Sequence, residues 1–197
     1  MREGRNPLAA AVLAGAVLVG VPDRGRTAGF AFVPRRGRGP FPVALWLHGY
    51  RGWSADGYFP GAARSAMQHH ADELGAVILG FPGTVRLPDG TFRWSENPST
   101  DDGYVLARLN DAARTIALDL SRVALFGFSE GGLVAAELAT LHPDRYLGAI
   151  VMSPGGSGPP RVAARRLPDH ARQTYLLFCN AGEDPAVVAA TRALARI

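Results

Sequence analysis

Short apolar runs alternate along the chain with amphipathic stretches, and the alternation keeps a regular period from residue 28 onward. The apolar runs are rich in Val, Leu, Ile and Phe, which is typical of strands buried on both faces of a parallel sheet. They predict strands over 28–33, 43–48, 76–81, 122–128, 147–153 and 175–180. Apolar positions at helical spacing predict helices over 61–74, 103–118, 130–141 and 185–196.

One long polar segment, 82–101, separates the third strand from the next helix and contains a Pro-Asp-Gly turn. Because strands and helices otherwise follow one another in turn, the pattern predicts an α/β fold with a mostly parallel sheet and helices on both faces. No composition shift divides residues 27–197, so we expect one domain there, preceded by an N-terminal segment, 1–26.

The N-terminal segment carries an apolar stretch from Leu8 to Val21 that follows Arg2 and Arg5. This arrangement resembles a signal peptide, although no clear cleavage site follows it, and the stretch also fits a first helix or strand of the fold. With 14 residues it is too short to cross a bilayer comfortably, so we expect no stable membrane span. The lack of a clear cleavage site favours the cytoplasm over export as the compartment of the protein.

Composition narrows the function classes. Hydrophobic residues make up 47% of the 197 residues, which excludes a disordered chain, and the net charge of +4 is mild. Arginines gather between Arg24 and Arg38, but no nucleic-acid motif accompanies them, so we predict no nucleic-acid partner. A single cysteine excludes an internal disulfide, and no metal-binding or phosphate-binding motif is present. We therefore predict no metal and no cofactor.

The strongest chemical signal is the pentad Gly127-Phe128-Ser129-Glu130-Gly131, a GxSxG sequence. A predicted strand enters this pentad and a predicted helix leaves it, which is the context of a nucleophile elbow. In such an elbow a sharp turn lifts the serine hydroxyl above the sheet, and flanking glycines leave room for the turn. A glycine-rich tight turn without catalytic function is the alternative interpretation.

A second signal follows the strand 43–48, in the sequence Leu47-His48-Gly49-Tyr50. At this point, together with the segments ThrAspAspGlyTyr, SerArgValAlaLeuPheGlyPheSerGluGlyGly and HisProAspArgTyr, the chain resembles the α/β-hydrolase family. Within that family it is similar to serine esterases and polyhydroxyalkanoate-depolymerase-like carboxylesterases. The resemblance implies that Ser129 is the nucleophile, and that the backbone amides of Tyr50 and Glu130 bind the oxyanion.

The same resemblance places the catalytic acid in the sequence Gly182-Glu183-Asp184-Pro185, with Asp184 preferred over Glu183. Asp184 also fits a helix cap before an N-terminal proline, and the two roles can coexist. Asp101 and Asp102 match a family pair that begins a helix, where capping is expected.

Several aromatic residues follow the predicted oxyanion segment or lie in the segment 82–101. Such residues on loops over the strand ends are typical of an acyl or alcohol pocket, so we predict that Trp53 and Trp94 contact the substrate. The alternative for each is packing in the core. Arg51 and Arg93 could attract a substrate that carries a carboxylate.

The catalytic base is the one element that the pattern does not supply. In this fold the chain order is serine, acid and then histidine, and no histidine follows Asp184. The sequence therefore predicts a C-terminally incomplete α/β-hydrolase domain, with His170 as the best substitute base and His48 as a structural residue. Two functions follow: a serine esterase acting through an acyl-enzyme on a small or polymeric ester, or a truncated or non-catalytic binding protein with the same fold.

Overall fold

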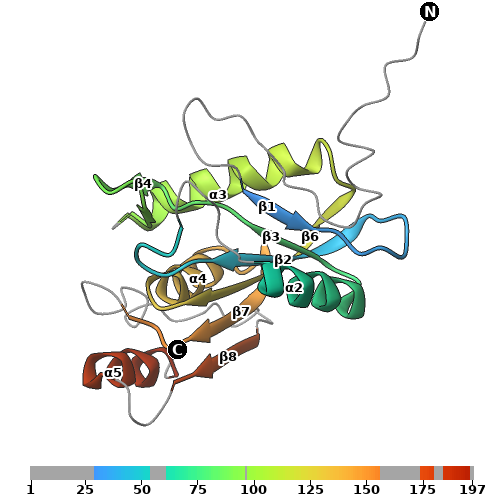
Figure 1. Ribbon diagram of the computed structural model, residues 1–197. Coiled ribbons are helices and arrows are strands. Elements are labelled where there is room, and N and C mark those ends of the chain that lie inside the picture. Colours follow the sequence, from blue (N-terminus) through green and yellow to red (C-terminus); the bar gives the residue numbers. More distant parts are fainter. Residues whose placement is uncertain (1–28, 54–60, 96, 156–173, 180–183, 196–197) are drawn as a thin grey trace, which may run out of the picture.

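The predicted strands lie side by side in one six-stranded, mostly parallel sheet in the order β1-β3-β2-β6-β7-β8 (Figure 1). The computed structural model describes residues 29–53, 61–95, 97–155, 174–179 and 184–195, so the segment 1–26 lies outside the described residues. The strands are β1 (Phe30–Phe32), β2 (Phe41–Leu47), β3 (Val77–Gly80), β6 (Leu118–Phe128), β7 (Tyr146–Met152) and β8 (Thr174–Phe178). β1 is antiparallel to β3, and all other neighbours in this sheet are parallel.

The strand order contains a point where the chain changes direction across the sheet. From β2 the chain passes to β3 on one side, and then crosses back to β6 on the other side of β2. In open α/β sheets the ligand crevice forms outside the carboxyl ends of the strands at such a switch point. Leu47 pairs with Gly127, so the segments that leave β2 and β6 start next to each other at this crevice.

Helices cover both faces of the sheet, as the alternation predicts. The buried side chains of α3 (Pro98–Ala113) and α4 (Glu130–Leu141) join one core cluster with Leu45 and Leu47 of β2. Helix α2 (Gly61–Leu74) packs with β1 on the other face, toward which Ala44 and Trp46 of β2 point. The alternation of side chains along a strand therefore places β2 between two apolar layers.

Two helices, α2 and α4, have the predicted bounds, but α3 begins five residues earlier than expected, at Pro98. The reason is an N-cap: the side chain of Asn97 accepts a hydrogen bond from the Ser99 amide, and Pro98 follows as the first helical residue. The expected capping role of Asp101 and Asp102 is therefore wrong. Both residues lie inside α3, and their carboxylates bind other parts of the chain.

The segment that the sequence predicts as a long polar loop contains a small antiparallel hairpin, β4 (Val85–Arg86) and β5 (Phe92–Arg93). The predicted turn closes it, because the Gly90 amide donates to the Leu87 carbonyl over 2.9 Å and Gly90 has a φ of 81°. A positive φ of this size favours glycine. The hairpin pairs with the segment that follows β2 through a bridge between Phe92 and Trp53.

The last strand in the described sheet is β8, which is followed by helix α5 (Pro185–Leu194). Several large apolar side chains on β6, β7 and β8 are exposed: Phe128, Leu147, Ile150, Leu176 and Phe178.

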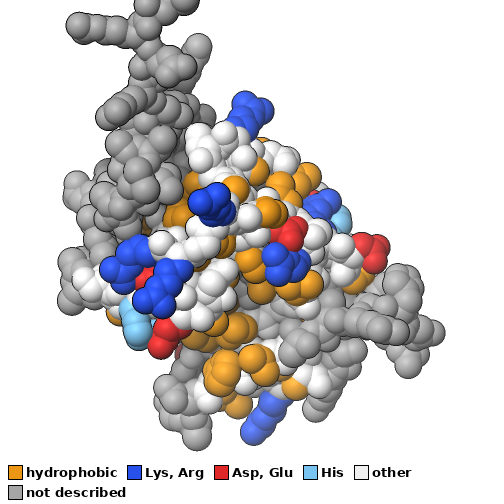
Figure 2. All heavy atoms as spheres, turned by 90° about the vertical axis from the view of Figure 1, so that its right-hand side faces the viewer, with side chains coloured by type: hydrophobic (Ala, Val, Ile, Leu, Met, Phe, Trp, Pro, Cys, Tyr) orange, Lys and Arg blue, Asp and Glu red, His pale blue; other side chains and the backbone are white. Residues whose placement is uncertain are grey.

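Figure 2 views the opposite end of the sheet from Ser129 and shows Arg side chains spread over that face, several of them beside acidic ones. Two ion pairs between arginine and aspartate join Arg35 to Asp72 and Arg122 to Asp119. Among the helices that the structure describes, none is long and apolar enough to span a membrane.

Candidate active site

Ser129 occupies a strained turn between β6 and α4. Its backbone has φ 55° and ψ −122°, a conformation that a non-glycine residue rarely adopts. A Cβ placed on Gly127 would overlap the carbonyl of Gly131, and a Cβ on Gly131 would overlap the carbonyl of Leu47. The two glycines of the pentad are therefore required by the close approach of three backbone segments, as in a nucleophile elbow.

Backbone hydrogen bonds hold this turn from both sides. The Ser129 amide donates to the Met152 carbonyl over 3.0 Å, which ties the turn to the end of β7. The Ser129 carbonyl accepts from the Gly132 amide over 3.0 Å, which starts helix α4. The amino end of α4 thus lies directly after a half-buried serine, where its dipole favours negative charge.

The segment after β2 lies against Ser129. A Cβ built on Gly49 would stand 3.2 Å from the Ser129 Cβ, so Gly49 and Ser129 are in close contact. The segment turns back immediately, since the Gly52 amide donates to the Gly49 carbonyl over 2.8 Å and Arg51 has a φ of 57°. Tyr50 lies at the tip of this turn with half of its surface exposed.

His48 is fully buried beneath that turn. Its Nδ1 is 2.7 Å from the Gly49 carbonyl oxygen, and its Nε2 accepts from the Gly83 amide over 2.7 Å. Because Nε2 is an acceptor, the imidazole is neutral with its proton on Nδ1, which donates to Gly49. Burial lowers the pKa of His48 to about 4, so this form persists at neutral pH. The prediction of a structural role for His48 is confirmed.

The structure corrects the substrate contacts predicted for Trp53 and Trp94, because both indoles belong to the core. Trp53 is 1% exposed and stacks on Phe30 at a centroid distance of 5.3 Å. Trp94 is 0% exposed, and its Nε1 donates to the His48 carbonyl over 2.8 Å. Buried to this extent, neither side chain reaches a substrate in this structure. The other aromatic candidates, Tyr58 and Phe59, lie outside the described residues.

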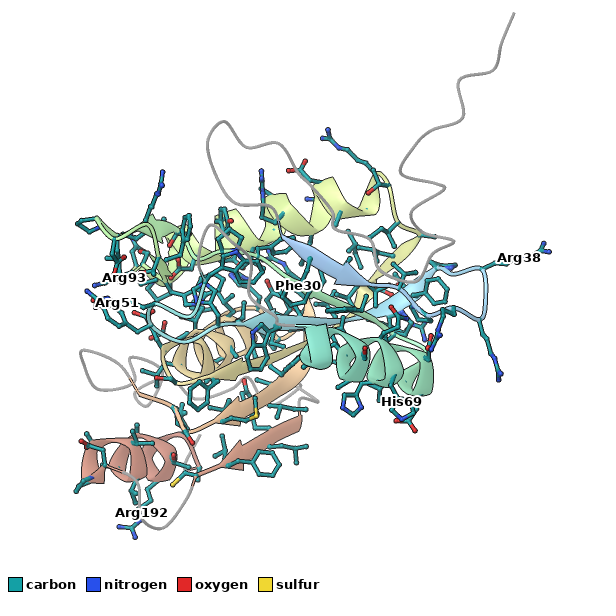
Figure 3. All side chains as sticks on the ribbon, in the orientation of Figure 1. Phe30, Arg38, Arg51, His69, Arg93 and Arg192 are labelled. Carbon is teal, nitrogen blue, oxygen red and sulfur yellow. The ribbon has the colours of Figure 1, made fainter. Side chains whose placement is uncertain are left out.

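The side chain of Glu130 ties the elbow to the hairpin, a contact that the sequence analysis missed. Its Oε2 accepts from the Trp94 amide over 3.1 Å, and its Oε1 lies 3.9 Å from Nε of Arg93. Arg51 pairs with Asp89 of the hairpin at 3.4 Å. Figure 3 shows Arg51 and Arg93 at the same end of the sheet, opposite Arg38. Both arginines near the site therefore already have acidic partners.

Asp101 anchors both ends of the hairpin segment, residues 84–95. Its Oδ1 accepts from the Thr84 hydroxyl over 2.6 Å and from the Ser95 amide over 3.0 Å. The side chain is fully buried, and burial raises its pKa to about 6. The sequence next to Asp101 does not reveal this role, since the partners are 17 and 6 residues away.

Asp184 begins helix α5, where its Oδ1 accepts from the Ala186 amide over 2.7 Å. The capping role considered for it is thereby confirmed, and the residue is exposed. Gly155 links this helix to the serine, because a Cβ built on Gly155 would stand 3.8 Å from Ser129 Oγ and 3.2 Å from Val187 Cγ2. The first turn of α5 therefore lies on the same side of the sheet end as Ser129.

The remaining histidines of the described residues lie elsewhere. His69 and His70 are exposed on α2 beside Glu73. His142 ends α4, twelve helical residues or ~18 Å beyond Ser129, and its Nε2 lies 3.1 Å from Asp102. His170 lies outside the described residues. Within the described ranges, no group of three or more His, Cys, Asp or Glu side chains is arranged to hold a metal ion.

Comparison with known proteins gives relatives that are named as esterases, although no family model matches the chain. Esterase FrsA of Klebsiella pneumoniae is 28% identical over 138 residues, which cover 68% of this chain and 30% of FrsA. NocK of Nocardia uniformis subsp. tsuyamanensis is 29% identical over 60% of this chain and 34% of that protein. The chain thus spans about a third of the length of these curated relatives.

Solved structures extend the similarity to most of the chain. A carboxylesterase from Mesorhizobium loti matches 92% of this chain and 85% of its own with a TM-score of 0.59 at 21% identity. A thermostable esterase matches 94% of this chain and 52% of its own with a TM-score of 0.61 at 18% identity. Together with the parallel sheet and its helices, these matches show that the chain has the α/β-hydrolase fold and resembles esterases.

Proposed function

We propose that this protein is a serine hydrolase of the carboxylesterase type, with Ser129 as its nucleophile. The observation that carries the proposal is the strained elbow, in which Ser129 keeps a positive φ between two glycines that admit no Cβ. Strain of this kind persists where the surroundings impose it, and it is common at active sites. The esterase named among the relatives supports ester hydrolysis as the reaction class.

In the proposed reaction, Ser129 Oγ attacks the carbonyl carbon of an ester while a base takes the hydroxyl proton. The carbonyl oxygen becomes an oxyanion, which the amides of Tyr50 and Glu130 bind. Collapse expels the alcohol, which receives the proton, and leaves an acyl-enzyme. Water then repeats the attack on the acyl carbon, releases the acid and restores Ser129. The start of α4 and the turn after β2 supply the two amides from adjacent strands.

Asp184 and His170 complete the proposed triad. Asp184 begins a helix whose first turn shares Gly155 as a neighbour with Ser129 Oγ. Its capping bond uses Oδ1, and a carboxylate has further acceptor sites for an imidazole N–H. His170 is proposed as the base because both nitrogens of His48 already have partners and the other described histidines are far from the elbow. Besides these side chains and amides, the proposed reaction needs only the ester and water.

A second candidate is an α/β-hydrolase-like protein that binds an acyl ligand without turning it over. The observation that favours it is that none of the histidines among the described residues is available to Ser129. Without a base, a serine hydroxyl is a weak nucleophile at neutral pH. Such a protein would keep the elbow and the oxyanion amides and would use them only for binding.

Hydrolysis of p-nitrophenyl butyrate separates the two candidates. The serine hydrolase requires that turnover be lost in Ser129→Ala and kept in Ser65→Ala, a matched change at an exposed serine of α2. His170→Ala tests the base, and its loss should lower kcat by a factor of about 1,000 or more. Equal rates for the wild type and Ser129→Ala would exclude a catalytic Ser129. Full activity of His170→Ala would exclude His170 as the base.

A further inference from the structure

Trp94 contacts both of the segments that supply the proposed oxyanion amides. Its indole Nε1 donates to the carbonyl of His48, in the segment that leads to Tyr50, over 2.8 Å. Its backbone amide donates to Oε2 of Glu130, the residue that follows the nucleophile, over 3.1 Å. A single residue from the hairpin segment therefore bridges the turn after β2 and the start of α4.

The contact with His48 bears on the direction of the Tyr50 amide. The carbonyl of Gly49 and the N–H of Tyr50 belong to one planar peptide, in which the two bonds point in opposite directions. That carbonyl is held by His48 Nδ1 at 2.7 Å and by the Gly52 amide at 2.8 Å. Trp94 holds the carbonyl of the preceding peptide, so that two consecutive peptides of this turn have fixed orientations.

Trp94 is itself held in place by the core rather than by the site. Its side chain is fully buried, and its carbonyl accepts from Arg93 Nε over 3.0 Å. The next residue, Ser95, donates its amide to Asp101 over 3.0 Å. The Phe92 amide, two residues earlier, donates to the Trp53 carbonyl over 3.0 Å. These contacts make Trp94 a rigid reference point for both segments.

We propose that Trp94 is a positioning residue that sets the spacing and direction of the Tyr50 and Glu130 amides. It acts through the bond from its indole to the His48 carbonyl and through the bond from its backbone amide to the Glu130 carboxylate. The proposal rests on the function proposed above. Trp94 touches no reacting atom, because its side chain is buried. Its effect is preorganisation of the donors before the oxyanion forms.

Preorganised donors act on the transition state more than on the bound ester. Removal of one oxyanion donor typically lowers kcat by about 100-fold to 1,000-fold. Loosening a donor that remains present should cost less, about 10-fold to 100-fold in kcat, with KM within about 2-fold of the wild type. The affinity for a boronic acid, which forms a tetrahedral adduct with serine, should fall by the same factor as kcat.

Two variants each cut one of the two bonds. Trp94→Phe keeps the aromatic ring and the backbone amide but removes the indole N–H, so it cuts only the bond to His48. Glu130→Ala keeps the Glu130 amide but removes the acceptor for the Trp94 amide, together with the ion pair between Glu130 and Arg93. Trp46→Phe is the control, since Trp46 is another indole of the sheet and packs on Phe126 at a centroid distance of 5.0 Å.

The measurements are kcat and KM for p-nitrophenyl butyrate, the dissociation constant of n-butylboronic acid, and the thermal unfolding midpoint. The proposal requires that both variants lose kcat and boronic acid affinity together at unchanged KM, while Trp46→Phe does not. If Trp94→Phe fails to fold, Glu130→Ala decides. Folded variants with kcat and boronic acid affinity within about 2-fold of the wild type would overturn the role of Trp94 alone. A wild type with neither Ser129-dependent turnover nor boronic acid binding would overturn the proposed function and this role with it.

Discussion

Gly131 lies so close to the carbonyl oxygen of Leu47 that a Cβ at position 131 would overlap it. The contact joins the first turn of α4 to the last residue of β2, and thus fixes how the elbow meets the turn that carries Tyr50. A Cβ there would also stand 2.5 Å from the His48 carbonyl oxygen. Both neighbours are backbone atoms, which cannot move aside as a flexible side chain can.

Gly131→Ala should therefore destabilise the protein by about 3 kcal/mol, at the upper end of what overpacking usually costs. Urea unfolding measures the change in the free energy of unfolding. Gly103→Ala is the matched control, because Gly103 is exposed on α3 with no heavy atom within 4 Å of a Cβ there. That variant should gain about 0.5–1 kcal/mol from helix propensity. Equal stability of the two variants would contradict the close contact at Gly131.

His48 should make the protein less stable as the pH falls through the window from about 6.5 to 4. Burial lowers its folded-state pKa from 6.5 to about 4, so the unfolded chain binds more protons within this window. Protonation would also place an N–H on Nε2, where it would face the Gly83 amide. The free energy of unfolding, measured at pH 7 and at pH 4.5, should fall more for the wild type than for the non-titrating variant His48→Gln. A parallel pH dependence of the two proteins would contradict a buried, neutral His48.

The Asp101 carboxyl group should have the opposite effect on how stability depends on pH. Burial raises its folded-state pKa from 3.8 to about 6, so the folded protein binds more protons between these values than the unfolded chain does. Relative to Asp101→Asn, which does not titrate, the wild type should gain stability as the pH falls from 7 to 4.5. The comparison of the two proteins at both pH values isolates this carboxyl group from the other titrating groups. A relative loss at low pH would show that the Asp101 carboxylate is stabilised as an ion in the folded state.

Asn97 should stabilise α3 by about 1 kcal/mol through its side-chain cap. Asn97→Ala removes the acceptor for the Ser99 amide, and thermal or urea unfolding should report that loss. Asp101, in the first turn of this helix, should keep its bonds to Thr84 and Ser95 in this variant, so the proposed esterase activity should be retained as long as the variant is folded. A stability equal to the wild type would argue against the cap at this position.

The sequence predicts the parts of this molecule that depend on local pattern. Apolar runs of six or seven residues identify the buried strands, and the GxSxG pentad predicts the turn at Ser129 because only glycine fits beside it. The start of α3 was misplaced because its signal, Asn97 followed by Pro98, lies inside a stretch that is polar throughout. A cap depends on one side chain, and apolar periodicity does not report it.

The contacts between distant segments could not be predicted. Trp94 is bonded to His48, which is 46 residues away, and its amide binds Glu130, 36 residues away in the other direction. An aromatic residue in a polar loop fits a pocket wall and a buried support equally well from sequence. Which one it becomes depends on how the hairpin of β4 and β5 packs on the segment that follows β2, and no local pattern encodes that packing.

Ser129 is the proposed nucleophile, and covalent labelling tests the reactivity of its hydroxyl most directly. A fluorophosphonate phosphonylates an activated serine with loss of fluoride, and peptide mass spectrometry locates the adduct. We expect one adduct per chain, on the peptide that contains Ser129, with labelling lost in Ser129→Ala and kept in Ser65→Ala. An unlabelled wild-type protein, or an adduct on a different serine, would contradict it.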